Sequence, residues 1–195
     1  MPLVRDEFIK PDVRLAVWRL TEAVEDFVVP RQLDLSMMRS DSRKCEVLAI
    51  YALLAHMTGR DGLLIDHDET GRPSVPGWKL GISHTKGWAA LIMSKMRTVA
   101  IDIEYQSERV ARVSDRFLRP DEKRGTVSCQ LISWSAKETV YKLLSEENLQ
   151  FSEMRLKTFE ESDQGVVEVE DLKKPKSVMV NFELNKDYVL TYAVE

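Results

Sequence analysis

Two carboxylates in one short run could bind a cation. The run Ala100–Glu104 reads AIDIE, and its alternation of apolar and acidic residues predicts a strand. In an extended strand Asp102 and Glu104 point to the same side, with Cα atoms about 6.5–7 Å apart, while the two isoleucines point into the core. Both carboxylates could then approach one hard cation. A strand whose solvent face happens to be acidic would show the same pattern.

A tryptophan, a glutamate and a lysine recur four residues apart in the run WSAKETVYK, Trp134–Lys142. In a helix, Trp134, Glu138 and Lys142 lie along one face. A Glu–Lys pair at this spacing is commonly a surface ion pair worth ~0.2–0.5 kcal/mol. The large aromatic residue beside the pair indicates instead that this face is turned toward another part of the protein.

His84 ends a predicted strand just before the turn TKG, with Ser83 beside it. A histidine at a strand end is most often a surface or hydrogen-bonded structural residue, and no spacing here resembles a Ser-His-Asp triad. The alternative is an imidazole that donates to an anionic oxygen of a phosphate. His56 and His67 have no helical histidine partner, which disfavours a zinc site.

Basic residues open the first long predicted helix, which Ser40 or Asp41 caps. Arg39, Arg43 and Lys44 lie there, where free backbone N–H groups also favour an anion. Basic side chains at a helix N-terminus oppose the helix dipole, so their presence favours a role in binding a ligand. For each of them, a solvated helix face is the simpler interpretation.

The elements that must position these residues follow from periodicity and turn signals. The helix that begins at Ser40 or Asp41 continues through Met57 and ends before Gly59. Other helical patterns are a short segment between Thr21 and Pro30, residues 107–118 and about residues 125–147. Strands are predicted at 12–20, 63–66, 78–84, 88–96, 98–104, 154–159, 165–172, 177–184 and 187–194.

This order of elements predicts an α+β protein made of two similar halves, each with a long helix and antiparallel strands. The expected halves are residues 1–97 and 98–195, which meet near residues 98–104 without a Gly/Ser-rich linker. The second half carries the candidate metal-binding carboxylates, and the active site is expected at the interface of the halves.

Composition restricts the classes of protein that need to be considered. With 44% hydrophobic and 31% charged residues, the chain of 195 residues is expected to fold around a sizeable core. A net charge of -4 argues against general nucleic-acid binding, although a local basic patch could hold a phosphorylated ligand. No apolar run approaches the ~20 residues of a membrane span, and no secretory signal is apparent, so we expect a cytoplasmic protein.

Two cysteines are present, Cys45 and Cys129. They lie far apart in helical patterns and lack the spacing of metal ligands. We therefore expect reduced, buried thiols with a structural role.

Three runs in order, TGRPSVPGWKLGISHTKGWAA, VAIDIE and WSAKETVYK, resemble the 4′-phosphopantetheinyl transferase superfamily, particularly its single-chain, surfactin-synthetase-activating type. The resemblance covers roughly residues 40–145. It implies transfer of the phosphopantetheine arm of coenzyme A to a serine of an apo acyl or peptidyl carrier protein, with release of adenosine 3′,5′-bisphosphate. Such an enzyme is a holo-carrier-protein synthase, and its fold has two α+β halves.

The resemblance also assigns roles in the second half of the chain. It implies that Asp102, Glu104 and Glu138 bind Mg²⁺, which suits an all-oxygen site with room for water and phosphate. Lys142 would contact a pyrophosphate oxygen, with Lys137 in support. Glu138, Glu104 and Lys142 would be the catalytic residues, and the base for the carrier serine would be either Glu138 or a metal-bound water oriented by Glu104.

In the first half, the resemblance implies contacts with coenzyme A. His84, with Ser83 beside it, would bind a coenzyme A phosphate, and Arg43 would bind the 3′-phosphate. Arg72, in the G-x-P turn, would neighbour the adenine nucleotide. Many relatives carry a further arginine on the helix of Arg43, where this chain has Tyr51.

Two other functions are compatible with these residues. One is a catalytically idle relative that binds a carrier protein or a nucleotide. The other is a metal-dependent nuclease, because acidic strand residues and a Lys-Glu pair also suit phosphodiester cleavage. The acidic net charge and the Ser-His strand disfavour the nuclease. A transferase of this kind would form a complete site from one chain, so we expect a monomer with no nucleic-acid or membrane partner.

Overall fold

The computed structural model describes residues 2–122 and 125–195. The chain divides into two compact units, Met1–Val99 and Ala100–Glu195, called here the N-terminal and the C-terminal unit. The expected division between residues 97 and 98 lies close to this boundary. Each unit combines a long helix with an antiparallel sheet, which confirms the predicted α+β class.

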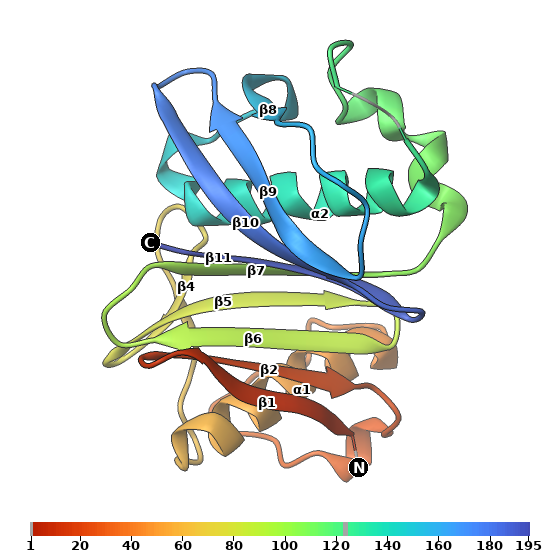
Figure 1. Cartoon of the computed structure of the whole chain (residues 1–195). Coiled ribbons are helices and arrows are strands. Elements are labelled where there is room, and N and C mark those ends of the chain that lie inside the picture. Colours follow the sequence, from red (N-terminus) through yellow and green to blue (C-terminus); the bar gives the residue numbers. More distant parts are fainter. Residues whose placement is uncertain (1, 123–124) are drawn as a thin grey trace. The chain divides into compact units, whose positions relative to one another are not determined.

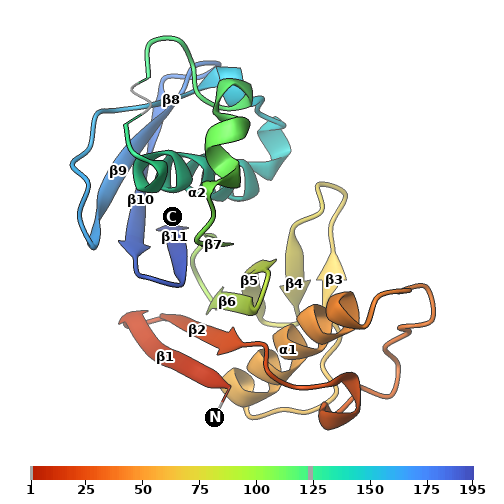
Figure 2. The ribbon, with the colours of Figure 1, turned by 90° about the vertical axis from the view of Figure 1, so that its right-hand side faces the viewer.

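In the described part of the N-terminal unit, six strands form one sheet: β1 (Leu3–Lys10), β2 (Val13–Arg19), β3 (Asp66–His67), β4 (Pro73–Val75), β5 (Trp78–Thr85) and β6 (Trp88–Ser94). Their order is β1-β2-β6-β5-β4-β3, and neighbouring strands are antiparallel. The helix α1 (Asp41–Thr58) packs on β2, β6 and β5 (Figure 2). The core of this unit therefore lies between α1 and one face of the sheet.

The ends of α1 are determined by local sequence. Ser40 caps the N-terminus, where its hydroxyl accepts a hydrogen bond from the backbone N–H of Arg43 at 3.4 Å. Gly59 ends the helix in the left-handed conformation, with φ of 66°. Leu48 and Leu53 are fully buried, as the helical periodicity predicts. The prediction of this helix is confirmed.

In the described part of the C-terminal unit, the sheet has five strands: β7 (Val99–Tyr105), β8 (Met154–Leu156), β9 (Gln164–Asp171), β10 (Lys176–Leu184) and β11 (Tyr188–Val194). Their order is β7-β11-β10-β9-β8. The helix α2 (Val127–Leu143) packs on β11, β10 and β9 (Figure 1). Thr126 caps α2 and accepts from the backbone N–H of Cys129 at 3.1 Å. Because β7 neighbours β11, α2 can contact residues of β7.

Several predicted elements differ from the structure. The helical patterns at 21–30 and 107–118 form only 3-10 turns: η1 (Val24–Asp26), η2 (Glu108–Arg112) and η3 (Ser114–Arg116). Between η2 and η3, the β-branched Val113 adopts φ of -120°, which is outside the helical region. The strand β1 was not predicted, because an edge strand rich in charged residues lacks a clear apolar face. The helix predicted at about residues 125–147 ends as α2 at Leu143 and is followed by η4 (Ser145–Glu147), and η5 (Phe151–Glu153) was not predicted.

Both cysteines are free thiols, as expected. Cys45 is buried, but Cys129 is only half-buried, so the expectation of burial is right for Cys45 alone. The Sγ atom of Cys129 lies 3.2 Å from Oε2 of Glu161. In the part of the chain that the structure describes, no helix has the length and apolar composition needed to cross a membrane.

Candidate active site

Strand β7 of the C-terminal unit directs its even-numbered side chains toward α2. Ala100 belongs to the core cluster that contains the apolar residues of α2. Asp102 accepts a hydrogen bond from Ser135, and Glu104 accepts one from the indole N–H of Trp134, both at 2.8 Å. Asp102 is only 4% exposed, so the interpretation of an acidic solvent face is wrong for this residue. The two carboxylates instead face the unit's own long helix.

The carboxylate of Asp102 is bonded at both oxygens. Lys142 donates to Oδ1 at 2.7 Å, and the hydroxyl of Ser135 donates to Oδ2 at 2.8 Å. Lys142 also donates to the backbone carbonyl of Ile101 at 3.2 Å. Lys142 on α2 therefore forms an ion pair with Asp102 on β7. The spacing of Glu138 and Lys142 alone did not predict this contact.

Glu138 lies half-buried on α2, one turn before Lys142. Burial raises the pKa of Glu138 to about 7, and the negative charge of Asp102 adds to the increase. Lys142 opposes the shift, and Glu104 adds to it. The three carboxylates are therefore close enough to repel one another, and this part of the unit favours a positive charge.

The donor set of this group fits a hard cation. Asp102, Glu104 and Glu138 offer only carboxylate oxygens, the ligands that Mg²⁺ prefers. Within residues 2–122 and 125–195, however, no three His, Cys, Asp or Glu side chains form an arrangement that would hold a metal ion. In this structure Lys142 supplies the positive charge next to Asp102. The donor atoms suit Mg²⁺ in chemistry and charge, whereas their arrangement in this structure accommodates the ammonium of Lys142. We call Asp102, Glu104, Glu138 and Lys142 together the carboxylate group.

Trp134 holds Glu104 in place. Its ring lies against Phe117 and Phe151, with ring centroids 5.2 Å away in both cases. Its indole N–H is directed to Oε1 of Glu104. The aromatic contacts orient the indole, and the indole in turn orients the carboxylate. The inward-facing tryptophan expected from the sequence is present.

Lys137 lies apart from the carboxylate group, although the sequence placed it in support of Lys142. Its side chain is fully buried, and its ammonium donates to Glu122 at 2.8 Å and to the carbonyl of Phe117 at 2.7 Å. It also donates to the carbonyl of Phe151 at 3.3 Å. Burial lowers the pKa of Lys137, and the ion pair with Glu122 opposes this change. Lys137 therefore ties the segment before α2 to the segment after it.

The N-terminal unit brings Arg43 and His84 together. His84 lies on the same face of β5 as Leu80 and Ile82, the face that α1 covers. Nη1 of Arg43 contacts Nε2 of His84. A carboxylate that was not singled out in the sequence, Glu46, lies 3.1 Å from Arg43 Nη1 and 3.2 Å from His84 Nδ1. Glu46 follows Arg43 by three residues on a helix, and this spacing could have indicated the contact from the sequence.

Two other residues expected near coenzyme A lie elsewhere in the N-terminal unit. Ser83 is buried on the face of β5 opposite to His84, because successive side chains of a strand alternate. Arg72 lies in the turn before β4, where Asp68 accepts from its backbone N–H at 3.0 Å. The hydroxyl of Tyr51 accepts from the backbone N–H of Ile65 at 3.4 Å.

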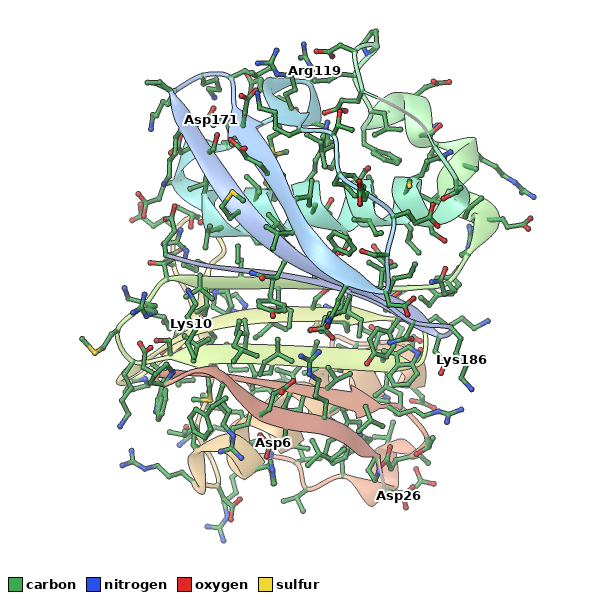
Figure 3. The ribbon with its side chains drawn as sticks, viewed as in Figure 1. Asp6, Lys10, Asp26, Arg119, Asp171 and Lys186 are labelled. Carbon is green, nitrogen blue, oxygen red and sulfur yellow. The ribbon has the colours of Figure 1, made fainter. Side chains whose placement is uncertain are left out.

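The remaining basic and histidine candidates have surface or structural contacts. Lys44 forms an ion pair with Asp41 at 2.9 Å, within the first turn of α1. Nε2 of His56 lies 2.8 Å from a carboxylate oxygen of Asp6, which Figure 3 labels on β1. His67 is exposed in β3.

One comparison with known proteins found a match to a family model. Residues 98–193 match a family model described as the 4′-phosphopantetheinyl transferase superfamily. The matched segment extends from just before β7 into β11, so it contains the whole carboxylate group. A search of curated proteins found no match.

Proposed function

Because this chain belongs, through residues 98–193, to the 4′-phosphopantetheinyl transferase superfamily, we propose that it modifies apo acyl or peptidyl carrier proteins. The proposed reaction transfers the phosphopantetheine arm of coenzyme A to a serine hydroxyl of the carrier. Adenosine 3′,5′-bisphosphate is the second product. The resemblance of the three motifs to the single-chain, surfactin-synthetase-activating type supports the assignment to that type.

The observation that carries this proposal is that Asp102, on β7, faces α2. Its buried carboxylate brings Lys142 to the same place as Glu104 and Glu138. A phosphoryl transfer requires that the charge of the pyrophosphate be neutralised and that the attacking and leaving oxygens be held in line. Three carboxylates and an ammonium are the groups that can bind a cation and an anionic pyrophosphate together.

The residues of the carboxylate group have separate roles in the proposed reaction. Asp102, Glu104 and Glu138 would hold Mg²⁺, which when bound neutralises charge on the pyrophosphate. Lys142 binds a pyrophosphate oxygen, for which its partly exposed ammonium is suited. Trp134 keeps Glu104 directed toward this group through the indole hydrogen bond.

The proposed transfer forms one bond and breaks one bond, and it needs no further reactant. The serine Oγ of the carrier forms a bond to the phosphorus next to the pantetheine arm. The bond between that phosphorus and the bridging oxygen breaks, and adenosine 3′,5′-bisphosphate leaves with the electron pair. The serine proton passes to a carboxylate, for which we propose Glu138.

In the N-terminal unit, we assign phosphate binding to Arg43 and His84. Both can donate to an anionic oxygen, and they lie together next to Glu46. Arg43 is half exposed, so its guanidinium is accessible to a ligand. The expectation of a single site formed by both units stays a prediction, as do the monomer and the cytoplasmic location. Light scattering of the purified protein checks the monomer.

Mass spectrometry of a carrier protein tests the proposed reaction. An apo acyl carrier protein is incubated with this protein, coenzyme A and Mg²⁺, and a parallel sample contains a chelator instead of the metal. We expect the carrier to gain the mass of one phosphopantetheine group only when the metal is present. The carrier variant in which alanine replaces the accepting serine is the matched control and should gain nothing.

Two results would reject the transferase. Binding of coenzyme A without any gain of mass across several carriers would favour the catalytically idle relative. Metal-dependent cleavage of DNA by the same preparation would favour the nuclease.

A further inference from the structure

Three buried hydroxyl groups form a line that ends on Asp102. Ser135 and Thr139 lie one turn apart on α2, and Thr191 lies on β11. The Oγ atom of Ser135 is 2.8 Å from Oδ2 of Asp102 and 2.8 Å from Oγ1 of Thr191. The Oγ1 atom of Thr139 is 2.7 Å from that of Thr191. All three hydroxyl-bearing residues have no exposed surface.

The number of hydroxyl protons indicates the direction of the hydrogen bonds along this line. Each hydroxyl has one proton to donate, and an ionised carboxylate only accepts. Ser135 therefore donates to Asp102, and the contact between Ser135 and Thr191 requires the proton of Thr191. The Thr191 hydroxyl is also 2.9 Å from the Ser135 carbonyl, which competes with the Ser135 hydroxyl for the single proton of Thr191.

The last contact of the line follows in the same way. With its own proton directed to Ser135, Thr191 accepts from Thr139. When Thr191 donates to the Ser135 hydroxyl, the three donors point along one path to Oδ2 of Asp102. A chain of aligned hydrogen bonds polarises each member, which strengthens the bond at its end.

This arrangement determines which oxygen of Asp102 is presented to a ligand. Oδ2 is occupied by the hydroxyl line, and Oδ1 is the oxygen that Lys142 contacts. Rotation of the carboxylate would leave a buried hydroxyl of Ser135 without its acceptor, which is unfavourable. The orientation of Asp102 thus depends on a residue of β11 that is distant in sequence.

We propose that Ser135, Thr139 and Thr191 are positioning residues that orient Asp102 so that its Oδ1 atom, which Lys142 contacts in this structure, is the one directed to a divalent cation. The inference rests on the proposed function, because it assumes that Asp102 is a metal ligand. None of the three hydroxyls touches the cation or the substrate. They act through Asp102 alone, as hydrogen-bonding partners of metal ligands commonly do.

A neighbouring serine shows that a buried hydroxyl on α2 does not need such a partner. Ser133 is 3% exposed, and its hydroxyl donates at 2.8 Å to the carbonyl of Cys129 in the preceding turn of the same helix. This bond is the usual local one for a serine within a helix. Ser133 and Ser135 therefore form a matched pair: both are buried on α2, but only Ser135 contacts Asp102.

Binding of Mn²⁺, used as a spectroscopic substitute for Mg²⁺, tests the proposal without a measurement of activity. Titration of the full-length protein is followed by the electron paramagnetic resonance signal of free Mn²⁺. We expect Ser135→Ala to weaken Mn²⁺ binding about 10-fold or more, the lower end of the range for changes to partners of metal ligands. We expect Ser133→Ala to bind Mn²⁺ as the wild type does. Thermal unfolding of both variants checks that each is folded.

A second pair of variants tests the more distant part of the line. Thr191→Val keeps the shape of the side chain and removes the hydroxyl, so it should also weaken Mn²⁺ binding. Thr191→Ser keeps the hydroxyl and should restore the affinity, although it loses the buried methyl group. A role in packing alone predicts the opposite order.

The outcomes separate this inference from the proposed function. Equal Mn²⁺ affinity of Ser135→Ala and the wild type overturns the positioning role, as does equal weakening by Ser133→Ala. Absence of Mn²⁺ binding by the wild type overturns both proposals. Binding that depends on Ser135, without any transfer to a carrier, supports the positioning role and rejects the transferase.

Discussion

The ammonium of Lys142 lies 2.7 Å from Oδ1 of Asp102, and this ion pair joins the last turn of α2 to the middle of β7. The two partners differ in exposure, because the side chain of Asp102 is 5% exposed and that of Lys142 is 31% exposed. Lys142 can be rehydrated when it leaves the pair, whereas Asp102 would keep a buried charge. The site is therefore built to retain a cation, and the ammonium is the partner that can be exchanged.

Replacement of Asp102 should lower the stability of the protein. Asp102→Ala removes the acceptor of the Ser135 hydroxyl and the partner of Lys142, so we expect the free energy of unfolding to fall by about 1–3 kcal/mol. Urea unfolding measures the change, and Asp187→Ala, at an exposed loop residue, is the control. Equal stability of Asp102→Ala and the wild type would contradict the buried role.

The stability of the metal-free protein should depend on the ionisation of Glu138. Its pKa in the folded protein is raised from 4.5 to about 7, so the folded state holds this proton more tightly than the unfolded state. The stabilisation is complete below pH 4.5 and is lost as the pH rises through about 7. Glu138→Gln is neutral at every pH, so its melting temperature should exceed that of the wild type by several degrees at pH 8.

This difference should shrink as the pH falls toward 5. Melting temperatures measured between pH 5 and pH 8.5 in the presence of a chelator check the prediction. A constant difference across this range would show that Glu138 does not titrate there. The chelator is essential, because a bound cation would itself stabilise the ionised carboxylate.

Removal of the charge from two lysines of α2 should have different effects: the loss of Lys137 should lower stability, and the loss of Lys142 should lower activity. Lys137→Met leaves the buried Glu122 with its backbone donors but without its cationic partner, so we expect a loss of about 3–5 kcal/mol in the free energy of unfolding. The double variant Lys137→Met with Glu122→Gln should recover part of this loss. Lys142→Met should lower kcat/KM for coenzyme A about 100-fold, by analogy with removal of other preorganised charges, with a smaller change in stability.

The two readouts together decide which lysine serves the substrate. Urea unfolding and the transfer assay are applied to both single variants. A large kinetic effect of Lys137→Met in protein that is still folded would restore the expected role of Lys137 in ligand binding.

The proposed role of Arg43 can be tested by removal of a phosphate from the substrate. We expect Arg43→Gln to raise KM for coenzyme A about 10-fold, the effect of losing one charge-assisted hydrogen bond. With 3′-dephospho-coenzyme A the wild type and the variant should have similar KM values. Arg39→Gln, one residue before the cap of α1, is the control. An equal effect of Arg43→Gln on both substrates would place Arg43 away from the 3′-phosphate.

Local sequence predicted much of the scaffold. Ser40 and Gly59 set the bounds of α1 because a cap and a left-handed glycine act within a few residues of the chain. The alternation in β7 placed Asp102 and Glu104 on one face, because that period is a property of any strand. The same reasoning failed for η2 and η3, since weak local helical preference was not supported by packing along a long helix face.

Residue types and local periodicity were enough to predict the chemical groups and which of them share a helix or strand face. What covers each face was visible only in the folded protein. Lys137 and Lys142 are both lysines of α2, yet one is buried against Glu122 and the other meets Asp102. Thr191 reaches the same network from β11, more than fifty residues along the chain from Ser135. Periodicity comes from local backbone geometry, whereas the partner on each face is selected by packing between elements that are distant in sequence.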